Sequence, residues 1–293
     1  MPHLFDQQRA DQTAPWRAAL SRISFRRVIQ VNALSKFYGD LAAVRDLTFS
    51  VAPGEVLGLV GPNGAGKTTT LRCLAGIIHP TDGRVLVAGV PMDTEPVAAK
   101  RRLSFIPDEP HLFEYLSVTE HLKFVARLYG VPNATPRAEA LIEELELSSK
   151  RDALPGELSR GMRQKLAIAC GLLHDPAVVI LDEPLTGLDP AGIRRMKRTI
   201  RAHATSGSAA ILSSHLLHLV EEVCDRVLVL RAGELVALGT ISEIVAERPE
   251  LHGKSLEEVF LALTSSSEEA IPAEPSGAAP SLIAPHDTPG AGA

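Results

Sequence analysis

The segment from residue 61 to residue 69 constrains this chain most, because it has the pattern G-x-x-x-x-G-K-T of a phosphate-binding loop. The apolar run Glu55–Val60 before it is typical of a buried strand, and leucines at helical spacing follow it. A glycine-rich turn between a strand and a helix presents backbone N–H groups and the positive end of the helix dipole to a polyphosphate. The sequence therefore predicts an α/β fold with a nucleotide site in this loop. The residues of the predicted site are Gly61, Pro62, Asn63, Gly64, Ala65, Gly66, Lys67, Thr68 and Thr69.

Two side chains of this loop carry chemistry of their own. Lys67 is long enough to reach the β- and γ-phosphates of a nucleotide, and the Thr68 hydroxyl can ligate Mg²⁺. The alternative is a glycine-rich turn that contains an incidental lysine. Because every required position of the pattern is filled and the flanking elements fit, we favour nucleotide binding.

A pair of carboxylates is the second candidate element of the site. Ala177–Leu181 is a continuous apolar run, typical of a central parallel strand, and Asp182 and Glu183 follow it directly. A carboxylate at the end of such a strand lies beside the phosphate loop in this class of fold. We predict that Asp182 holds Mg²⁺, directly or through water, and that Glu183 orients or deprotonates the attacking water. The alternative, a turn capped by two acids, accounts less well for the buried strand before them.

Two further residues are predicted to face the nucleotide. His215 follows the predicted strand Ala209–Ser213, and ligands gather at the carboxyl ends of strands in open α/β sheets. Tyr38 is expected in a turn between two predicted strands, Val28–Ala33 and Val44–Val51, where its ring can stack on a base. The alternative for Tyr38 is an ordinary packed tyrosine at a strand end.

The pattern of the chain predicts three regions. Residues 1–27 read as an extension, either a basic amphipathic helix on a membrane surface or, as we favour, a disordered leader. Residues 28–264 alternate strands and helices, with a helical insertion at about 118–175. Residues 265–293 combine Ala, Pro, Ser and Gly with acidic side chains and no Lys or Arg, which is typical of a disordered acidic tail.

The composition narrows the class of partner. A net charge of −5 and the lack of a basic stripe argue against nucleic acid. The three cysteines, Cys73, Cys170 and Cys224, form no C-x-x-C pair, which indicates buried thiols in a reducing compartment. No apolar run approaches the roughly 20 residues needed to cross a bilayer. If the protein works at a membrane, another chain is expected to supply the membrane part.

The segment Leu158–Lys165, with the sequence LSRGMRQK, lies shortly before the predicted strand that ends at Asp182. Together with the phosphate loop, it resembles the nucleotide-binding subunit of an ATP-binding-cassette (ABC) transporter over residues 28–264. Ser159 and Gly161 then match the signature loop of that family, and Leu188 and Asp189 match its D-loop.

The remaining motifs agree with this resemblance. Residues 61–69 match the Walker A loop, Asp182 and Glu183 match the Walker B pair, Tyr38 matches the base-stacking position and His215 matches the switch histidine. The resemblance implies a P-loop NTPase core with a mixed central sheet, an N-terminal antiparallel β subdomain and an inserted α-helical subdomain.

In function, the resemblance implies that the chain binds and hydrolyses ATP with Mg²⁺. It also implies two partners: an integral membrane permease subunit, and a second nucleotide-binding subunit, identical or not, that sandwiches ATP between its Walker A loop and the signature loop of the first. Such a protein is peripheral, on the cytoplasmic face of the cell membrane. The ending Ser255–Phe260 is similar to that of single-cassette bacterial exporters, which favours export over import.

Three positions, in two segments, depart from the pattern of the family. In the signature loop, Arg160 and Met162 stand where Gly and Gln are usual. In the earlier proline-flanked loop, Asp108 stands where Gln is usual. A carboxylate is a good ligand for Mg²⁺, but its charge repels a γ-phosphate when no metal lies between them. We expect Asp108 to engage the metal-bound nucleotide only in the closed, partner-docked state. The alternative is that Asp108 merely caps the proline-flanked loop.

Two other functions stay open at this stage. One is an ABC ATPase that acts on ribosomes or DNA, although such proteins usually carry two cassettes or a long coiled-coil insertion, and neither is visible here. The other is a regulatory module that binds ATP without hydrolysing it.

Overall fold

The computed structural model describes residues 28–248, 251 and 253–264. The predicted N-terminal extension and acidic tail lie outside these residues. The elements in chain order are β1 (Ile29–Tyr38), β2 (Leu41–Val51), β3 (Val56–Val60), α2 (Lys67–Leu74), β4 (Asp82–Val87), β5 (Val90–Pro91), α3 (Pro96–Lys100), β6 (Leu103–Ile106), α4 (Val118–Tyr129), α5 (Ala134–Glu144), the 3₁₀ turns η1 (Ser148–Lys150) and η2 (Pro155–Glu157), α6 (Arg160–Leu173), β7 (Val178–Asp182), α7 (Pro190–Thr205), β8 (Ala209–Ser213), α8 (Leu217–Val223), β9 (Arg226–Arg231), β10 (Glu234–Gly239), α9 (Ile241–Ala246) and α10 (Leu256–Thr264).

Two sheets form the scaffold. Strands β2, β1, β4 and β5 make an antiparallel sheet, in that order. The second sheet has the order β10-β9-β3-β8-β7-β6, parallel except for the β9–β10 hairpin. The structure therefore confirms an α/β fold with a mixed, mostly parallel core sheet and an N-terminal antiparallel sheet.

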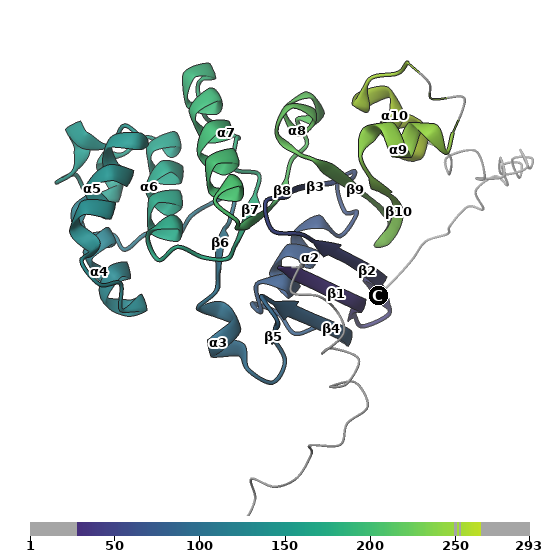
Figure 1. Cartoon of the computed structure of the whole chain (residues 1–293), viewed down its shortest axis with the longest axis horizontal. Helices are drawn as coiled ribbons and strands as arrows, with labels where there is room; N and C mark the ends of the chain where they lie inside the picture. The colour runs from purple at the N-terminus through teal and green to yellow at the C-terminus, as the bar shows by residue number, and fades with distance from the viewer. Residues whose placement is uncertain (1–27, 249–250, 252, 265–293) are drawn as a thin grey trace, which may run out of the picture.

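Apolar side chains bury both faces of the core sheet. On one face, α2 lies between the two sheets, and its Leu71 and Leu74 share a core with Leu57 of β3 and Ile180 of β7. On the other face, α7 and α8 cover the sheet, and their core continues into the helices α4, α5 and α6. Figure 1 shows these three helices grouped at one end of the molecule, away from the antiparallel sheet. None of the described helices is long and apolar enough to span a bilayer.

The helix α4 has a defined cap at each end. Ser117 caps it, because its hydroxyl accepts from the Glu120 backbone N–H while the Glu120 carboxylate accepts from the Ser117 N–H. Such reciprocal capping satisfies two N–H groups that the helix itself cannot pair. Gly130, in the left-handed conformation, ends the helix.

The first hairpin differs from the prediction. β1 extends to Tyr38, which pairs with Leu41, so Tyr38 is the last residue of a strand and not part of the turn. The apolar alternation stops early because β1 bulges: Ala33 has a φ of +50° and the pairing shifts between Val31 and Leu34. The short strand β5 is also missing from the prediction, since two residues give no alternation to detect.

Candidate nucleotide-binding site

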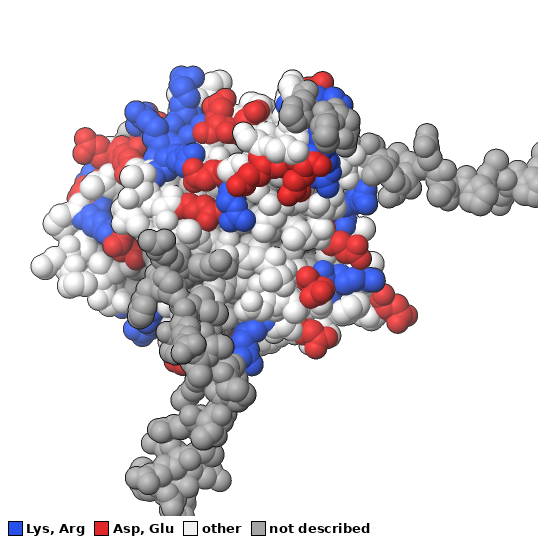
Figure 2. Space-filling model, turned by 45° about the vertical axis from the view of Figure 1, so that its right-hand side comes forward, with Lys and Arg blue, Asp and Glu red and all other residues white. Residues whose placement is uncertain are grey.

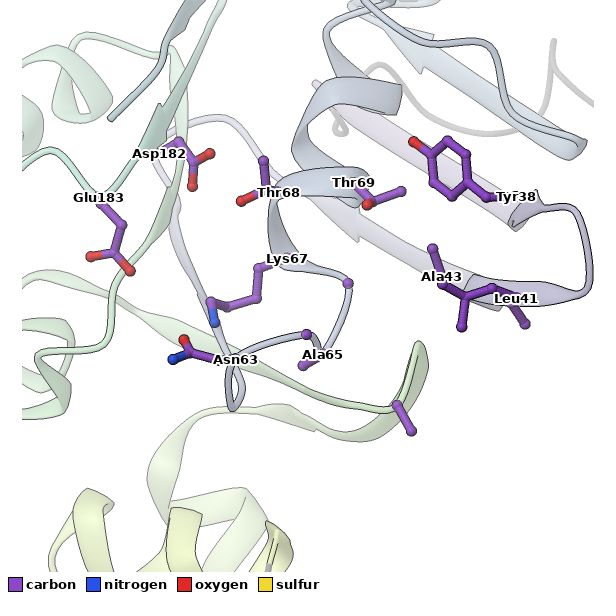
Figure 3. Close-up of a pocket in the computed structure, with 14 residues that line it drawn as sticks. Tyr38, Leu41, Ala43, Asn63, Ala65, Lys67, Thr68, Thr69, Asp182 and Glu183 are labelled. Atoms are coloured by element: carbon purple, nitrogen blue, oxygen red, sulfur yellow. The ribbon is translucent and has the colours of Figure 1, made fainter. Parts of the chain in front are cut away.

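A cavity of about 680 Å³ opens where the two sheets meet (Figure 3). The phosphate loop forms one wall, the first hairpin forms the second, and the end of β7 forms the third. The lining residues are Tyr38, Leu41, Ala42, Ala43, Asn63, Gly64, Ala65, Gly66, Lys67, Thr68, Thr69, Asp182, Glu183 and Ala232. The structure thus brings most of the predicted Walker A residues together with Tyr38 and both predicted carboxylates.

The phosphate loop requires its glycines. Gly66 precedes α2 with a φ of +98°, and a β-carbon on it would lie 2.3 Å from the carbonyl oxygen of Ala43. Gly61 is enclosed in the same way, since a β-carbon there would lie 2.5 Å from the Leu230 carbonyl oxygen. At Gly66 no side chain caps the helix, so the first N–H groups of α2 face the cavity without a side-chain acceptor. This end of α2 is therefore built to receive an external anion.

Lys67 extends back across the loop. Its ammonium group donates to the carbonyl oxygens of Gly61 and Pro62, at 2.7 Å and 3.1 Å. Burial lowers the pKa of Lys67, and the carboxylates of Glu183 and Asp182 partly oppose this. The cation is thus held at the centre of the loop, between backbone carbonyls and the two acids.

Asp182 and Glu183 leave the end of β7 in different directions (Figure 3). Asp182 is buried and accepts a hydrogen bond from the Ser213 hydroxyl at 2.6 Å, across the β7–β8 pairing. The same hydroxyl accepts from the Glu183 backbone N–H at 3.0 Å. Ser213, which the sequence reading missed, therefore fixes both acids. Its position at the end of β8, beside the end of β7, is the only signal in the sequence that points to it.

His215 is not part of the cavity lining, but it contacts Glu183, which is. The Nδ1 atom of His215 lies 2.8 Å from Oε2 of Glu183, and the histidine ring is more than half exposed. Glu183 has a φ of +50°, which is unusual for a residue with a side chain. A strained backbone therefore sets the direction of its carboxylate. The predicted site residues Glu183 and His215 are thus in direct contact.

The predicted signature residues lie on another surface, at the start of α6. Ser159 caps this helix, and its hydroxyl accepts from the Met162 N–H at 3.2 Å. A β-carbon on Gly161 would lie 3.2 Å from both the Gly187 carbonyl oxygen and the Leu188 side chain. Ser159 and Gly161 do not line the cavity described above.

Asp108 does not line the nucleotide cavity either. Its Oδ1 accepts from the guanidinium Nη2 of Arg160 at 2.9 Å. Asp108 and Arg160 are separate departures from the pattern of the family in the sequence, and the structure joins them. This contact links the loop after β6 to the first turn of α6.

A second cavity, of about 530 Å³, lies between that loop and the helices α4 and α6. Its lining is mostly apolar and includes Pro107 and Pro110, on either side of Asp108, as well as Phe113 and Phe124. The loop is anchored to α4, because the Phe113 backbone N–H donates to Nε2 of His121 at 3.0 Å. Two aromatic rings, Phe113 and Phe124, meet edge to face at 5.0 Å and remain partly exposed.

The residues of the first cavity fit a nucleoside triphosphate. The glycine turn leaves room for phosphate where a β-carbon would clash, Lys67 supplies a cation, and the Tyr38 ring stands at the far wall (Figure 3). No cluster of three metal-ligating side chains occurs among the described residues. A divalent ion here would therefore take ligands from Thr68 and Asp182 together with phosphate oxygens and water.

Comparisons with known proteins agree with this geometry. The model of the family described as "ABC transporter" matches residues 44–186. The Nod factor export ATP-binding protein I of Cupriavidus metallidurans is 35% identical over 248 residues, which cover 82% of each chain. The SkfA peptide export ATP-binding protein SkfE of Bacillus subtilis is 37% identical over 212 residues, 72% of this chain and 88% of that protein.

A solved structure of the ATP-binding subunit of an ABC transporter superposes with a TM-score of 0.77 at 34% identity, and the match covers 80% of this chain and 99% of that one. A nucleotide-free ATP-binding cassette at 22% identity shares the fold, with a TM-score of 0.67. Since relatives above 30% identity are covered over most of their length, the chain belongs to the ATP-binding subunits of ABC transporters and is an ABC transporter ATPase.

Proposed function

We propose that this subunit hydrolyses ATP with Mg²⁺ and thereby drives export through a separate membrane permease. The observation that carries the proposal is the contact of Glu183 with His215 at the edge of a cavity that also holds Lys67 and Asp182. A carboxylate beside a phosphate cradle can orient or deprotonate the water that attacks ATP, and the histidine here contacts that carboxylate.

Each residue of the cavity has a distinct task in this proposal. The N–H groups of the 61–69 loop and Lys67 bind the phosphates, and Tyr38 stacks on the base. Thr68 and Asp182 would hold Mg²⁺, which neutralises charge on the phosphates when it is bound.

Glu183 orients the attacking water and accepts its proton at the carboxylate. His215 contacts Oε2 of Glu183. As the more exposed partner of this pair, it is placed to contact the γ-phosphate. The strained backbone at Glu183 supports this assignment, because such conformations collect at functional sites.

Ser159 and Gly161 are proposed to meet the nucleotide of a second subunit, identical or not. They open a helix of 14 residues, whose dipole and N–H groups favour an anion. Their absence from the lining of the cavity in their own chain supports an arrangement in which two chains complete each other's sites.

The apolar cavity beside Asp108 is proposed to receive the permease. Its aromatic rings are partly exposed, and an exposed apolar concavity is typical of a surface that another protein covers. Such docking would place the subunit on the cytoplasmic face of the membrane. Export is proposed because relatives covered over most of their length are named as export proteins, for Nod factor and for the SkfA peptide.

Glu183→Gln tests the proposal. The exchange keeps the size of the side chain but removes the base, so turnover should fall at least about a hundredfold while ATP affinity is retained. ATPase rate and calorimetry on the purified chain measure the two quantities, and His218→Gln, on α8, is the control. Turnover at the wild-type rate in Glu183→Gln would refute the role of Glu183, and a wild-type chain that binds ATP without turnover would indicate a regulatory module.

A further inference from the structure

The Asp108–Arg160 contact joins two of the three positions at which this chain departs from the pattern of its family. The two residues are 52 positions apart, and both side chains are roughly half exposed. Arg160 is the first residue of α6, where a cation opposes the helix dipole, and Asp108 supplies the compensating negative charge. An exposed pair of this kind contributes little to global stability, so its effect should be sought in the loops that it joins.

The stem of Arg160 rests on the loop that follows β7. A β-carbon on Gly187 would lie 3.2 Å from Cδ and 3.4 Å from Nε of Arg160, and Gly187 has a φ of +76°. Gly161, the next residue in the same turn, approaches this loop at the Gly187 carbonyl oxygen and the Leu188 side chain. The first turn of α6 thus holds Gly187 and Leu188 by two neighbouring contacts.

This loop begins at the proposed catalytic carboxylate. Glu183 has a left-handed backbone, its carbonyl oxygen accepts from the Thr186 N–H at 3.2 Å, and the loop ends at Asp189, which caps α7 by accepting from the Gly192 N–H at 2.9 Å. A strained backbone persists only where the surrounding structure holds it in place. Arg160 lies against this loop at Gly187 and is one of the groups that can hold the backbone between Glu183 and Asp189 in place.

We infer that Arg160, fixed by Asp108, is a positioning residue for ATP hydrolysis, and that it braces the 183–189 loop so that Glu183 stays against His215. The inference rests on the proposed function. It gives Asp108 the role of holding Arg160, in place of the metal ligation that the sequence predicts. Pro107 and Pro110 flank Asp108 and line the apolar cavity. The brace therefore connects that cavity to the loop that carries Glu183.

Steady-state ATPase of the full chain, across ATP and Mg²⁺ titrations, tests the brace. Arg160→Ala should lower kcat about three- to tenfold with unchanged KM for ATP, because the phosphate loop is not touched. Asp108→Asn should lower kcat by less, and the double variant should be no worse than Arg160→Ala, since both changes act through one contact. Arg160→Lys, which keeps the charge and most of the stem, should recover part of the loss.

A matched ion pair elsewhere supplies the control. Arg151 and Glu139 also meet at 2.9 Å and are similarly exposed, but they join α5 to the segment after η1. Arg151→Ala and Glu139→Gln should leave kcat unchanged. Losses in these variants equal to that of Arg160→Ala would overturn the inference, and so would a higher Mg²⁺ requirement in Asp108→Asn alone, which would make Asp108 a metal ligand.

Hydrogen exchange gives a readout that does not depend on hydrolysis. In Arg160→Ala, a peptide that covers residues 183–189 should exchange faster, while the peptide that covers residues 61–69 should not change. Unchanged exchange at 183–189 would overturn the brace. If the wild-type chain proved inactive, the proposed function would fail, and this exchange measurement would still decide whether Arg160 holds the loop.

Discussion

The helices α2 and α6 both begin beside loops of the proposed sites, yet only α6 has a side chain that caps its first turn. At α2 the capping residue is Gly66, which has no side chain to accept from the helix, and the backbone around it is closed by the Ala43 carbonyl. At α6 the capping residue is Ser159, whose hydroxyl accepts from the Met162 N–H. The start of α2 thus leaves its N–H groups free of a side-chain acceptor, whereas at the start of α6 the Met162 N–H already has an acceptor within the chain.

This difference separates two kinds of anion site. The open end at α2 lines a cavity, with Lys67 beside it, and is proposed to bind phosphate in the isolated chain. The end at α6 has Arg160 in its first turn, and Asp108 already neutralises that cation. We therefore expect variants at α2 to reduce ATP binding directly, and variants at α6 to leave ATP binding by the isolated chain unchanged.

Gly66→Ala should have the largest effect at either helix. The new β-carbon would meet a backbone oxygen at 2.3 Å in a left-handed conformation, and the main chain must move. We expect a loss of about 2 kcal/mol or more in the free energy of unfolding and at least a tenfold weaker ATP affinity.

Gly64→Ala is the matched control for this variant. Gly64 has a φ of +77°, but nothing lies within 4 Å of a β-carbon built there, so the exchange carries the conformational cost without the collision. Thermal unfolding and calorimetry measure both variants. Equal effects in the two would show that close packing against Ala43 is not what shapes this end of α2.

Lys67→Ala should weaken ATP binding about ten- to a hundredfold, the range expected for the loss of a charge-assisted hydrogen bond. The pKa of Lys67 is lowered by burial, so its charge is lost at a lower pH than that of a free lysine. Bound phosphate favours the charged form, and ATP affinity should therefore decline as the pH rises through this lowered pKa.

Lys67→Arg separates this titration from other alkaline effects, because a guanidinium stays charged throughout that range. Calorimetry across the alkaline range should show a decline for the wild type and a flatter profile for Lys67→Arg. The same decline in both variants would show that another group titrates.

The comparison also explains which parts of the site the sequence predicts. The loop at 61–69 and the acids after β7 are local: each follows a strand, and the pattern of neighbouring residues places them. The burial of Asp182 at the end of β7 follows from the apolar run before it. Such features depend on backbone geometry that a few adjacent residues determine.

Contacts between distant segments were not predictable in the same way. The Asp108–Arg160 pair depends on how the loop after β6 approaches the first turn of α6 and on the rotamer of a flexible side chain. Ser213 binds Asp182 only because β7 and β8 are neighbours in register. Tyr38 was placed in a turn because a bulge at Ala33 interrupts the alternation that marks a strand.

Ser159→Ala is the smallest expected effect and the most direct test of the comparison. Loss of the cap leaves the Met162 N–H without its acceptor and should cost about 1 kcal/mol, or a few degrees in Tm for a domain of this size. Ser159→Thr should recover most of this loss, because threonine also caps helices.

At protein concentrations low enough to keep the chain monomeric, ATP affinity by calorimetry should equal that of the wild type in both variants, since Ser159 lies outside the cavity. A tenfold loss of affinity in Ser159→Ala under those conditions would show that the first turn of α6 serves the nucleotide of its own chain, and the contrast between the two helix ends would then fail.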